Sequence, residues 1–111
     1  MRNHNLFIKM PYFLLIESGK KKLEARANYP NLRNIKEHDT ITFMSGNKRV
    51  TVNVSKISVY DTVSSMLEAE PIEDLVPGSS FQEAKDIYNE IYPPEKVRKN
   101  NGMRVFSLVR L

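Results

Sequence analysis

The sequence predicts an α+β fold in which about five strands form a small, curved, mixed sheet or barrel with short helices packed against it. Three observations predict this fold. Short apolar runs typical of strands recur along the chain, helical patterns bounded by proline or glycine lie between them, and the two types follow one another in mixed order. With 111 residues, of which 41% are apolar, we expect residues 1–111 to form a single domain with its own core.

The first three elements are expected before residue 28. His4–Met10 carries three consecutive apolar residues and is typical of a strand. Pro11–Ser18 predicts a short helix, because proline suits a first helical turn and Gly19 suits the position after the last one. In Lys20–Ala27, apolar and charged residues alternate, which favours a strand over a helix.

A β-hairpin is predicted in the middle of the chain. Asn28–Asp39 is polar and contains a proline, so we expect a loop there. Thr40–Met44 and Lys48–Tyr60 are both typical of strands, and Ser45-Gly46-Asn47 between them predicts a hairpin turn. The apolar phase of the second strand changes along its length, so we expect a bulge near Ser55–Lys56.

Helices are predicted in the second half of the chain. Thr62–Ala69 has apolar residues at helical spacing, and Pro71–Pro77 is a short acidic connector with room for one helical turn. Ser80 and Glu83 have the spacing of a capping box, which begins a helix that ends at Pro93-Pro94. The apolar stripe of this helix is expected to face the core and consists of Phe81, Ala84, Tyr88 and Ile91.

Two further segments complete the chain. Glu95–Gly102 is basic and polar, and we expect a loop. Met103–Leu111 is rich in residues that favour strands, and we expect a final strand.

Charge is segregated along the chain, although the total is only +4. Residues 1–60 hold 11 bases and 4 acids, a net charge of +7. Residues 61–92 hold 1 base and 8 acids (net −7), and residues 93–111 hold 5 bases and 1 acid (net +4). Such segregation indicates a charged face for a partner, so we expect segments 20–36 and 96–99 to meet on one side and the acidic helices to lie on another.

The composition argues against several classes of site. The absence of cysteine excludes disulfides, thiolate metal sites and cysteine nucleophiles. His4 and His38 are the only histidines, which leaves a His-based triad without support, and we expect both in turns or at the surface. The longest apolar run, Phe13–Ile16, is far shorter than a membrane span. We therefore expect no metal, cofactor or membrane contact, and a cytoplasmic monomer.

One charged segment could carry chemistry. In a strand over Lys20–Ala27, alternation places Lys22, Glu24 and Arg26 on one face, with Lys21 joining them only if it lies in the preceding turn. Buried together, Lys21, Glu24 and Arg26 would need mutual pairing in a hydrogen-bonded cleft. The alternative is an ordinary solvated strand face.

The spacing Gly19-x-Lys21-x-x-Glu24-x-Arg26 resembles the G-x-K-x-x-E-x-R signature of the ASCH superfamily, a group of small PUA-like β-barrels. Two other features are similar to that family in the same order. Ile35–Ile41 resembles its (I/V)-K-x-G-D-x-I turn, with His38 in place of glycine, and the helix ending at Pro93 precedes a final strand. A position that favours glycine often needs a positive φ, which is less comfortable for histidine.

The resemblance implies a cleft beside the barrel that binds RNA or a modified nucleoside or nucleotide, with Lys21, Glu24 and Arg26 as ligand-binding residues. Arg26 offers a planar fork for a phosphate or carboxylate, Lys21 a point charge, and Glu24 an acceptor for the exocyclic amine of a base. A protein–protein adaptor that uses the acidic stretch 61–92 is a further alternative.

Some short bacterial members of this family hydrolyse N4-acetylcytidine, which implies an amidohydrolase as an alternative function. Lys21 matches their catalytic lysine, but Glu24 stands where they carry a threonine. Their catalytic glutamate aligns near Pro77, with Glu73 and Asp74 a few residues away. If this chain is an enzyme, Lys21 and Glu24 are the catalytic candidates, acting as base and orienter for a water.

A basic rim is expected around the same cleft. Its members attract phosphate, and Tyr12, Tyr29 and Tyr92 are available to stack on bases. The alternative is ordinary surface lysines and core tyrosines. The principal rim candidates are Arg33, Lys36, Lys96, Arg98 and Lys99, with Lys48 and Arg49 as further basic residues.

Overall fold

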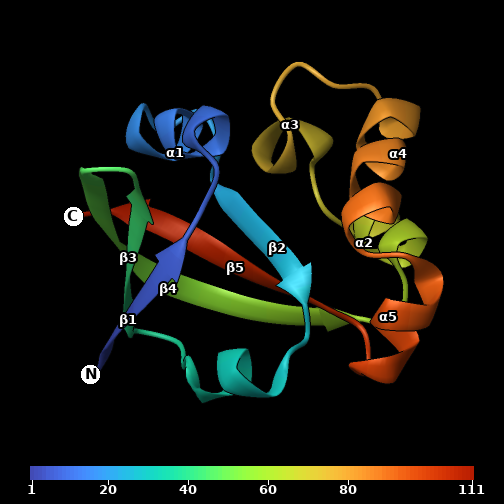
Figure 1. Ribbon diagram of the computed structural model, residues 1–111, viewed down its shortest axis with the longest axis horizontal. Coiled ribbons are helices and arrows are strands. Elements are labelled where there is room, and N and C mark those ends of the chain that lie inside the picture. The colour runs from blue at the N-terminus through green and yellow to red at the C-terminus, as the bar shows by residue number, and fades with distance from the viewer.

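A five-stranded, strongly curved sheet is the framework of the protein, and the computed structural model describes all of residues 1–111 (Figure 1). Its strands follow the order β1-β3-β4-β5-β2. β1 runs parallel to β3, and every other neighbouring pair is antiparallel. The strands are β1 (Asn3–Phe7), β2 (Leu23–Ala27), β3 (Thr40–Ser45), β4 (Lys48–Tyr60) and β5 (Met103–Arg110).

Five short α-helices and one 3-10 helix accompany the sheet. Figure 1 shows α1 over one end of the sheet and α2, α3, α4 and α5 gathered at the other. None is long and apolar enough to cross a membrane. The helices are α1 (Met10–Glu17), η1 (Pro30–Asn34), α2 (Val63–Ala69), α3 (Ile72–Leu75), α4 (Phe81–Ile91) and α5 (Pro94–Lys99).

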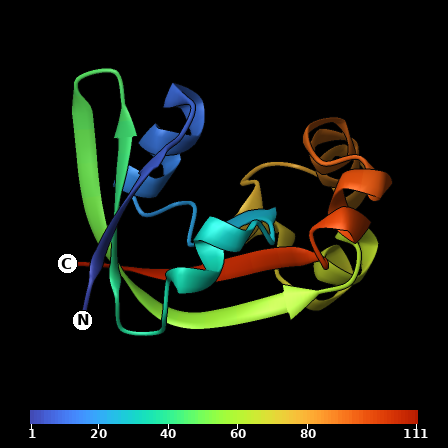
Figure 2. The ribbon, with the colours of Figure 1, turned by 60° about the horizontal axis from the view of Figure 1, so that its bottom comes forward.

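The long strand β4 curves the sheet into a half-barrel (Figure 2). Its first half pairs with β3 and its second half with β5, and the register with β5 shifts between Val54 and Lys56. A bulge at this point increases local twist, which lets one strand serve both halves of the sheet. The predicted hairpin and the predicted bulge are both confirmed, as is the α+β fold.

Two apolar cores lie on opposite faces of this curved sheet. Inside the half-barrel, α1 and η1 pack on side chains of β3, β4 and β5, with Phe13, Phe43 and Phe106 fully buried. Outside it, alternate residues of β2 and β5 pack against α2, α3, α4 and α5, around Met66, Leu75 and Met103. The alternation along β2 therefore sends Leu23, Ala25 and Ala27 into the outer core and leaves the polar residues between them on the other face.

Three predictions about local structure were wrong. Residues 95–102 contain α5 instead of an unbroken loop, and η1 lies in the predicted loop 28–39. Helix α5 is too short to show apolar periodicity, but Pro94 in its first turn and basic residues in its last are typical helix signals. In α4, Ala84 and Tyr88 are buried as predicted, whereas Phe81 and Ile91 are 41% exposed each.

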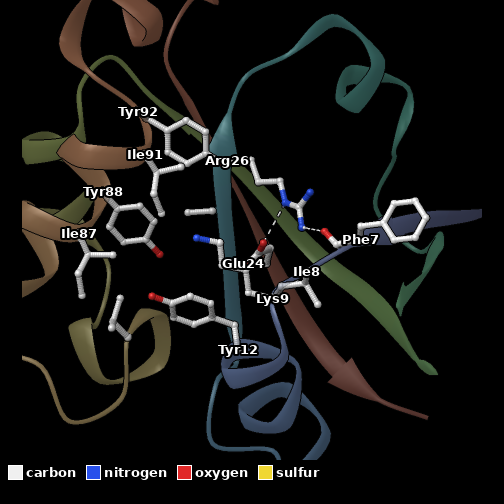
Figure 3. A pocket seen from close by; sticks show the side chains of 12 residues that line it. Phe7, Ile8, Lys9, Tyr12, Glu24, Arg26, Ile87, Tyr88, Ile91 and Tyr92 are labelled. Atoms are coloured by element: carbon white, nitrogen blue, oxygen red, sulfur yellow. Dashed lines mark hydrogen bonds and ion pairs between the residues drawn. The ribbon is translucent and has the colours of Figure 1, made fainter. Parts of the chain in front are cut away.

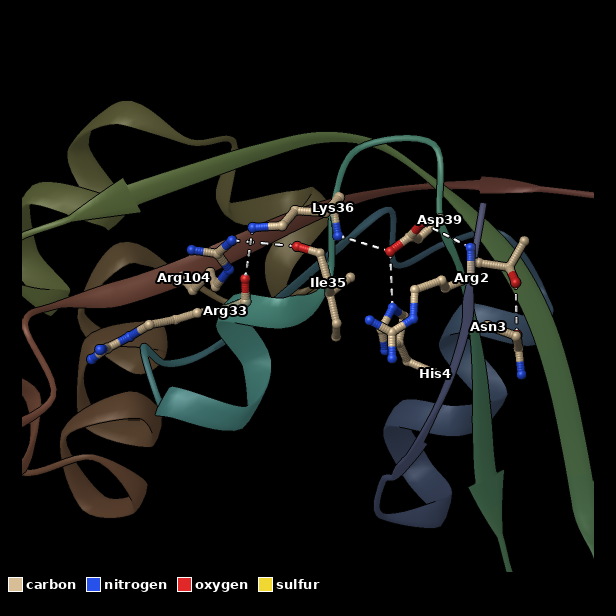
Figure 4. A network of polar contacts seen from close by, with 9 residues as sticks. Arg2, Asn3, His4, Arg33, Ile35, Lys36, Asp39 and Arg104 are labelled. Carbon is tan, nitrogen blue, oxygen red and sulfur yellow. Dashed lines mark hydrogen bonds and ion pairs between the residues drawn. The ribbon is translucent and has the colours of Figure 1, made fainter.

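Asp39 ties the N-terminus to the loop before β3 (Figure 4). Its carboxylate accepts hydrogen bonds from the backbone N–H groups of Lys36 and Arg2, both at 3.0 Å, and contacts His4 Nε2 at 2.9 Å. The backbone donor of Lys36, and then the His4 ring and the Arg2 N–H, hold the pKa of Asp39 well below its usual value. His4, expected at the surface, is half-buried in this contact.

We expect an Asp39→Asn variant to lose stability that depends on pH. Because the folded pKa lies below the unfolded value, the Asp39 carboxylate stabilises the fold fully above about pH 4 and progressively less as the pH falls toward the folded value. Urea denaturation at several pH values should therefore show that the free energy of unfolding is higher for wild type than for the variant at neutral pH, and that this difference becomes smaller below pH ~4. A gap that is constant from neutral to acid pH would contradict this role.

We expect His38→Gly to stabilise the protein. His38 has φ +75°, so the left-handed backbone that a glycine would favour is present here, as the sequence suggested. Relief of a penalty of about 1–2 kcal/mol, offset by about 0.4–1 kcal/mol of added unfolded-state entropy, leaves a net gain of about 0.5–1 kcal/mol. Thermal and urea unfolding measure this gain, and a lower stability of His38→Gly would show that the imidazole contributes more than the backbone strain removes.

Candidate functional site

A pocket of about 210 Å³ opens between the start of α1, strand β2 and the end of α4 (Figure 3). Its walls are mostly apolar, and the only charged residues that line it are Lys9, Glu24 and Arg26. A mostly apolar cleft with a few convergent polar groups is the usual form of a small-molecule or base-binding site. The apolar and aromatic lining consists of Phe7, Ile8, Tyr12, Ala25, Val76, Ile87, Tyr88, Ile91 and Tyr92.

Three tyrosines from two helices supply aromatic surface to this pocket. Tyr12 stands on α1, Tyr88 on α4, and Tyr92 directly after α4. Figure 3 shows the hydroxyl groups of Tyr12 and Tyr88 pointing toward one another. Burial, followed by the nearby Glu24 carboxylate, raises the pKa of Tyr92 to about 12 and that of Tyr88 well above its usual value. Both hydroxyls are therefore proton donors at neutral pH.

Lys21, Glu24 and Arg26 converge, as the sequence predicted for a hydrogen-bonded cleft. The ammonium of Lys21 lies 3.3 Å from Glu24 Oε1, and Arg26 Nε donates to Glu24 Oε2 at 2.9 Å. Lys21 precedes the first residue of β2, so strand alternation does not apply to it and its side chain can reach Glu24. Lys22, expected on the same face, is exposed and takes no part.

The three residues lie at different depths. Glu24 and Arg26 line the pocket, with Glu24 7% exposed and Arg26 half-buried, whereas Lys21 does not line it and is only 3% exposed. Lys21 Nζ donates to the carbonyl of Leu75 at 2.5 Å and lies 5.9 Å from the centre of the Tyr12 ring. Burial lowers the pKa of Lys21, while the ion pair with Glu24 raises it in part. Lys21 thus anchors Glu24 from beneath the pocket floor.

Arg26 also joins the two free edges of the half-barrel. Its Nη2 donates to the carbonyl of Phe7 at 2.7 Å, which connects β2 at one edge of the sheet to β1 at the other (Figure 3). The guanidinium is therefore fixed by Glu24 on one side and by the Phe7 carbonyl on the other. A side chain held in this way is preorganised to present its remaining N–H groups to a ligand.

The predicted basic rim does not form a single group. Arg33 contacts Lys36 and the segment that holds Lys96: Lys36 Nζ donates to the carbonyl of Arg33 at 3.2 Å, and Arg33 donates to that of Asn100 at 3.1 Å. Lys96 Nζ is 5.8 Å from the centre of the Tyr29 ring. Arg98 instead lines a separate, more polar pocket beside α2. The remaining basic residues, Lys48, Arg49 and Lys99, are exposed and line none of the pockets described.

The expected meeting of basic segments is therefore observed in part. The segments around residues 29–36 and 96–100 touch, as the Arg33 and Lys96 contacts show. The beginning of segment 20–36 lies against the acidic region instead. The backbone N–H of Lys22 donates to the carbonyl of Asp74, and the side chain of Lys21 donates to the carbonyl of Leu75. The acidic helices do not lie apart from the basic motif.

Sequence reasoning missed two features of the pocket. Lys9 was part of an expected strand but lies just before α1, where it lines the pocket. Tyr88 was expected only in the core, yet it both packs in the outer core and lines the pocket. The spacing of Tyr88 from Phe81 predicts only a position on the apolar stripe of the helix and does not indicate that Tyr88 also lines a pocket. No three His, Asp or Glu side chains are grouped to hold a metal ion.

Comparison with known proteins places the fold in a family. The model of the ASCH domain matches residues 6–104. The hypothetical protein PH0355 is 33% identical, with a TM-score of 0.87 and full coverage of both chains. Protein PF0455 from Pyrococcus furiosus is 32% identical, with a TM-score of 0.78 and coverage of 100% of this chain and 98% of that one.

A more distant structure shares the fold alone. ASCH from Zymomonas mobilis is 15% identical, with a TM-score of 0.66 over 95% of this chain and 65% of that one. No curated protein sequence matches this one. The family model covers most of the chain, and the PUA-like half-barrel agrees with it: the protein belongs to the ASCH domain family.

Proposed function

We propose that this protein binds RNA, or a modified nucleoside or nucleotide, by taking a base into the pocket between β2 and α4. The ASCH family is thought to bind RNA. The observation that carries the proposal is the combination of aromatic walls with one carboxylate and one fixed guanidinium in a single small cleft. Single-stranded RNA is commonly bound by stacking bases on aromatic side chains and reading their edges by hydrogen bonds.

Glu24 and Arg26 divide the recognition of the ligand between them. Each oxygen of the Glu24 carboxylate already has one cationic partner, and a carboxylate has about four acceptor sites, so capacity remains for the exocyclic amine of a cytosine or adenine. Arg26 is the donor for a base carbonyl or a phosphate oxygen. Lys21 supports Glu24 from below, and its role in binding is to hold that carboxylate in position through their 3.3 Å ion pair.

Calorimetric titration with cytidine, with N4-acetylcytidine and with a short single-stranded RNA tests this proposal. Tyr88→Phe keeps the ring and removes the hydroxyl, so we expect binding to weaken by up to about tenfold, a typical hydrogen-bond effect of about 1 kcal/mol. Glu24→Gln keeps the shape and removes the charge, and we expect a loss of tenfold or more. Binding by wild type that neither variant changes would place the ligand elsewhere.

Lys85→Ala is the matched control for these two variants. Lys85 lies on the same helix as Tyr88 but lines the separate pocket beside α2. Its loss should leave the affinity within about twofold, and a larger effect would favour that second pocket. If no nucleoside and no RNA binds to wild type, the proposed function is wrong and a protein–protein adaptor becomes the better explanation.

A second candidate function is hydrolysis of an N-acylated nucleoside such as N4-acetylcytidine. The observation that favours it is the buried pairing of Lys21 with Glu24 at 3.3 Å, in which burial lowers the pKa of the lysine and so makes its neutral, proton-accepting form easier to reach. Lys21 would take a proton from the water as the water oxygen attacks the acetyl carbonyl carbon. The bond from that carbon to N4 would then break, Lys21 would return the proton to N4, and acetate and cytidine would leave. Lys21 would have to turn from the Leu75 carbonyl toward the pocket to act in this way.

Release of cytidine from N4-acetylcytidine, followed by chromatography, tests the enzyme. Activity in wild type and a loss of at least about a hundredfold in Lys21→Met would support Lys21 as the base. Binding of N4-acetylcytidine without release would leave the binding function and exclude hydrolysis of this substrate. Release that Lys21→Met does not change would show that Lys21 is not the catalytic base.

A further inference from the structure

Three cations gather without an acidic partner at the end of β2 that lies away from Lys21. We call this group the cationic cluster, and its members are Arg33, Lys36 and Arg104 (Figure 4). None of the three takes part in any of the four ion pairs of the protein. The hydrogen-bond partners of their side chains are all neutral oxygens, so none of the three side-chain charges is paired with a carboxylate.

Arg104 is the least satisfied of the three. Its two terminal nitrogens make long contacts of 3.4 Å, to Asn28 Oδ1 and to the carbonyl of Ile35. Its Nε is the one buried side-chain nitrogen or oxygen in the protein that has no hydrogen-bond partner. Burial, with the nearby Arg33, lowers the pKa of Arg104. A buried donor without a partner is costly, so such a residue calls for an explanation.

Backbone carbonyls hold Arg33 and Lys36 in place. Arg33 Nε donates to the carbonyl of Asn28 at 3.1 Å, and Lys36 Nζ donates to the carbonyl of Arg33 at 3.2 Å. Lys36 is exposed, while Arg33 and Arg104 are half-buried, so an anion from solvent can reach the group. Hydrogen bonds to backbone carbonyls therefore hold these like-charged side chains close together.

The cluster is continuous with the pocket along two lines. Arg104 on β5 lies directly opposite Arg26 on β2, and cross-strand partners lie on the same face of a sheet. On the outer side, Tyr92 of the pocket lies 6.4 Å from Tyr29, measured between ring centres. Lys96 Nζ stands 5.8 Å from the Tyr29 ring centre and 6.0 Å from that of Tyr92, so aromatic and cationic groups alternate between pocket and cluster.

We infer that the cationic cluster is a second subsite that binds the phosphate of a nucleotide adjoining the one whose base enters the pocket, so that a short single-stranded RNA follows the line from pocket to cluster. This inference rests on the proposed function. A phosphodiester supplies the negative charge that the cluster lacks, and guanidinium groups match its geometry. The tyrosines between the two subsites fit unpaired, stackable bases, which favours a single strand over a duplex.

The test uses a fluorescent single-stranded RNA of about six nucleotides, which spans both subsites, and cytidine, which fills only the pocket. Lys36→Gln/Lys96→Gln removes two exposed charges beside the RNA path and keeps the side chains of Arg33 and Arg104. Because each lost phosphate contact lowers the slope of log affinity against log salt by about 0.7, we expect the slope to fall by about 1.4. Affinity for the RNA should fall at least tenfold at low salt, and affinity for cytidine should not change.

The matched control is Lys20→Gln/Arg49→Gln, which removes two exposed charges remote from the cluster and gives the same net charge. It should keep the wild-type salt slope. An unchanged slope in Lys36→Gln/Lys96→Gln, or an equal loss in the control, would overturn the subsite. Binding of inorganic phosphate as tight as binding of the RNA would also overturn it, because the cluster would then be a site for free phosphate.

Different results would contradict base binding in the pocket and phosphate binding at the cationic cluster. If wild type binds neither cytidine nor the RNA, the proposed function itself is wrong. If Glu24→Gln weakens binding of both ligands while the salt slope is insensitive to Lys36 and Lys96, the pocket stands and the second subsite does not exist. An Arg104→Lys variant gives an independent check, since a lysine lacks the planar fork and should weaken binding of the RNA but not of cytidine.

Discussion

Glu24→Ala is expected to destabilise the protein by about 3–5 kcal/mol, the usual effect of removing one partner of a buried ion pair. The carboxylate lies between the ammonium of Lys21 at 3.3 Å and Nε of Arg26 at 2.9 Å. Without it, Lys21 would remain 3% exposed with a single carbonyl as its partner. Urea denaturation at neutral pH measures the loss.

Two further variants separate the ion pair from simple loss of volume. Lys21→Met/Glu24→Leu replaces both charges with apolar groups and should recover most of the stability, because a buried pair contributes little net free energy relative to apolar packing. Lys22→Ala removes the exposed neighbour and should change stability by no more than about 0.5 kcal/mol. A loss below about 1 kcal/mol in Glu24→Ala would contradict the account of Glu24 as the hub of a buried cluster.

Gly102→Ala is expected to cost about 3 kcal/mol or more. Gly102 has φ +111°, and a Cβ on it would overlap the backbone carbonyl oxygen of Tyr60, which belongs to β4 and cannot move freely. The expected cost combines about 1–2 kcal/mol for the backbone conformation with about 1–3 kcal/mol for overpacking. Gly102 is also the link between α5 and β5, and its carbonyl accepts from Asn28 N–H at 2.9 Å.

Gly78→Ala is the natural control for Gly102→Ala. Gly78 has a similar backbone, with φ +81°, but a Cβ there would meet no atom within 4 Å. Its substitution should therefore cost only the conformational part, about 1–2 kcal/mol. Thermal unfolding measures the stability of both variants. An equal loss of stability in the two would show that the backbone around Tyr60 moves at little cost to accommodate a Cβ at Gly102, which would contradict the prediction.

The elements that could be predicted from the sequence are those with strong local signals. The Ser80–Glu83 capping box, the hairpin turn at Ser45–Asn47 and the bulge near Lys56 all follow from chemistry within a few residues, and all are present. Helix α5 was missed because its six residues bury only Val97, too little for a periodic pattern. Local signals therefore predict turns and caps well and very short helices poorly.

The candidate site was predictable only where its residues share one motif. Glu24 and Arg26 meet because alternation on one strand places them together, and Lys21 joins them because it lies in the turn before that strand. The groups that surround them come from distant parts of the chain: the Leu75 carbonyl is 54 residues from Lys21, and Arg104 is opposite Arg26 only because β5 pairs with β2. The pairing of strands that are far apart in the sequence leaves no local pattern. The walls of the pocket and the cationic cluster could therefore not be predicted from the sequence and were identified only in the structure.

A nuclear magnetic resonance titration of the uniformly ¹⁵N-labelled protein with cytidine and with a short single-stranded RNA shows most directly whether a base enters the pocket between β2 and α4. We expect cytidine to shift the backbone amide resonances around Ile8, Glu24–Arg26 and Ile87–Tyr92, and the RNA to add shifts at Tyr29, Arg33 and Arg104. Shifts confined to Thr62–Ser64 and Lys85, or no shifts with either ligand at millimolar concentration, would contradict it.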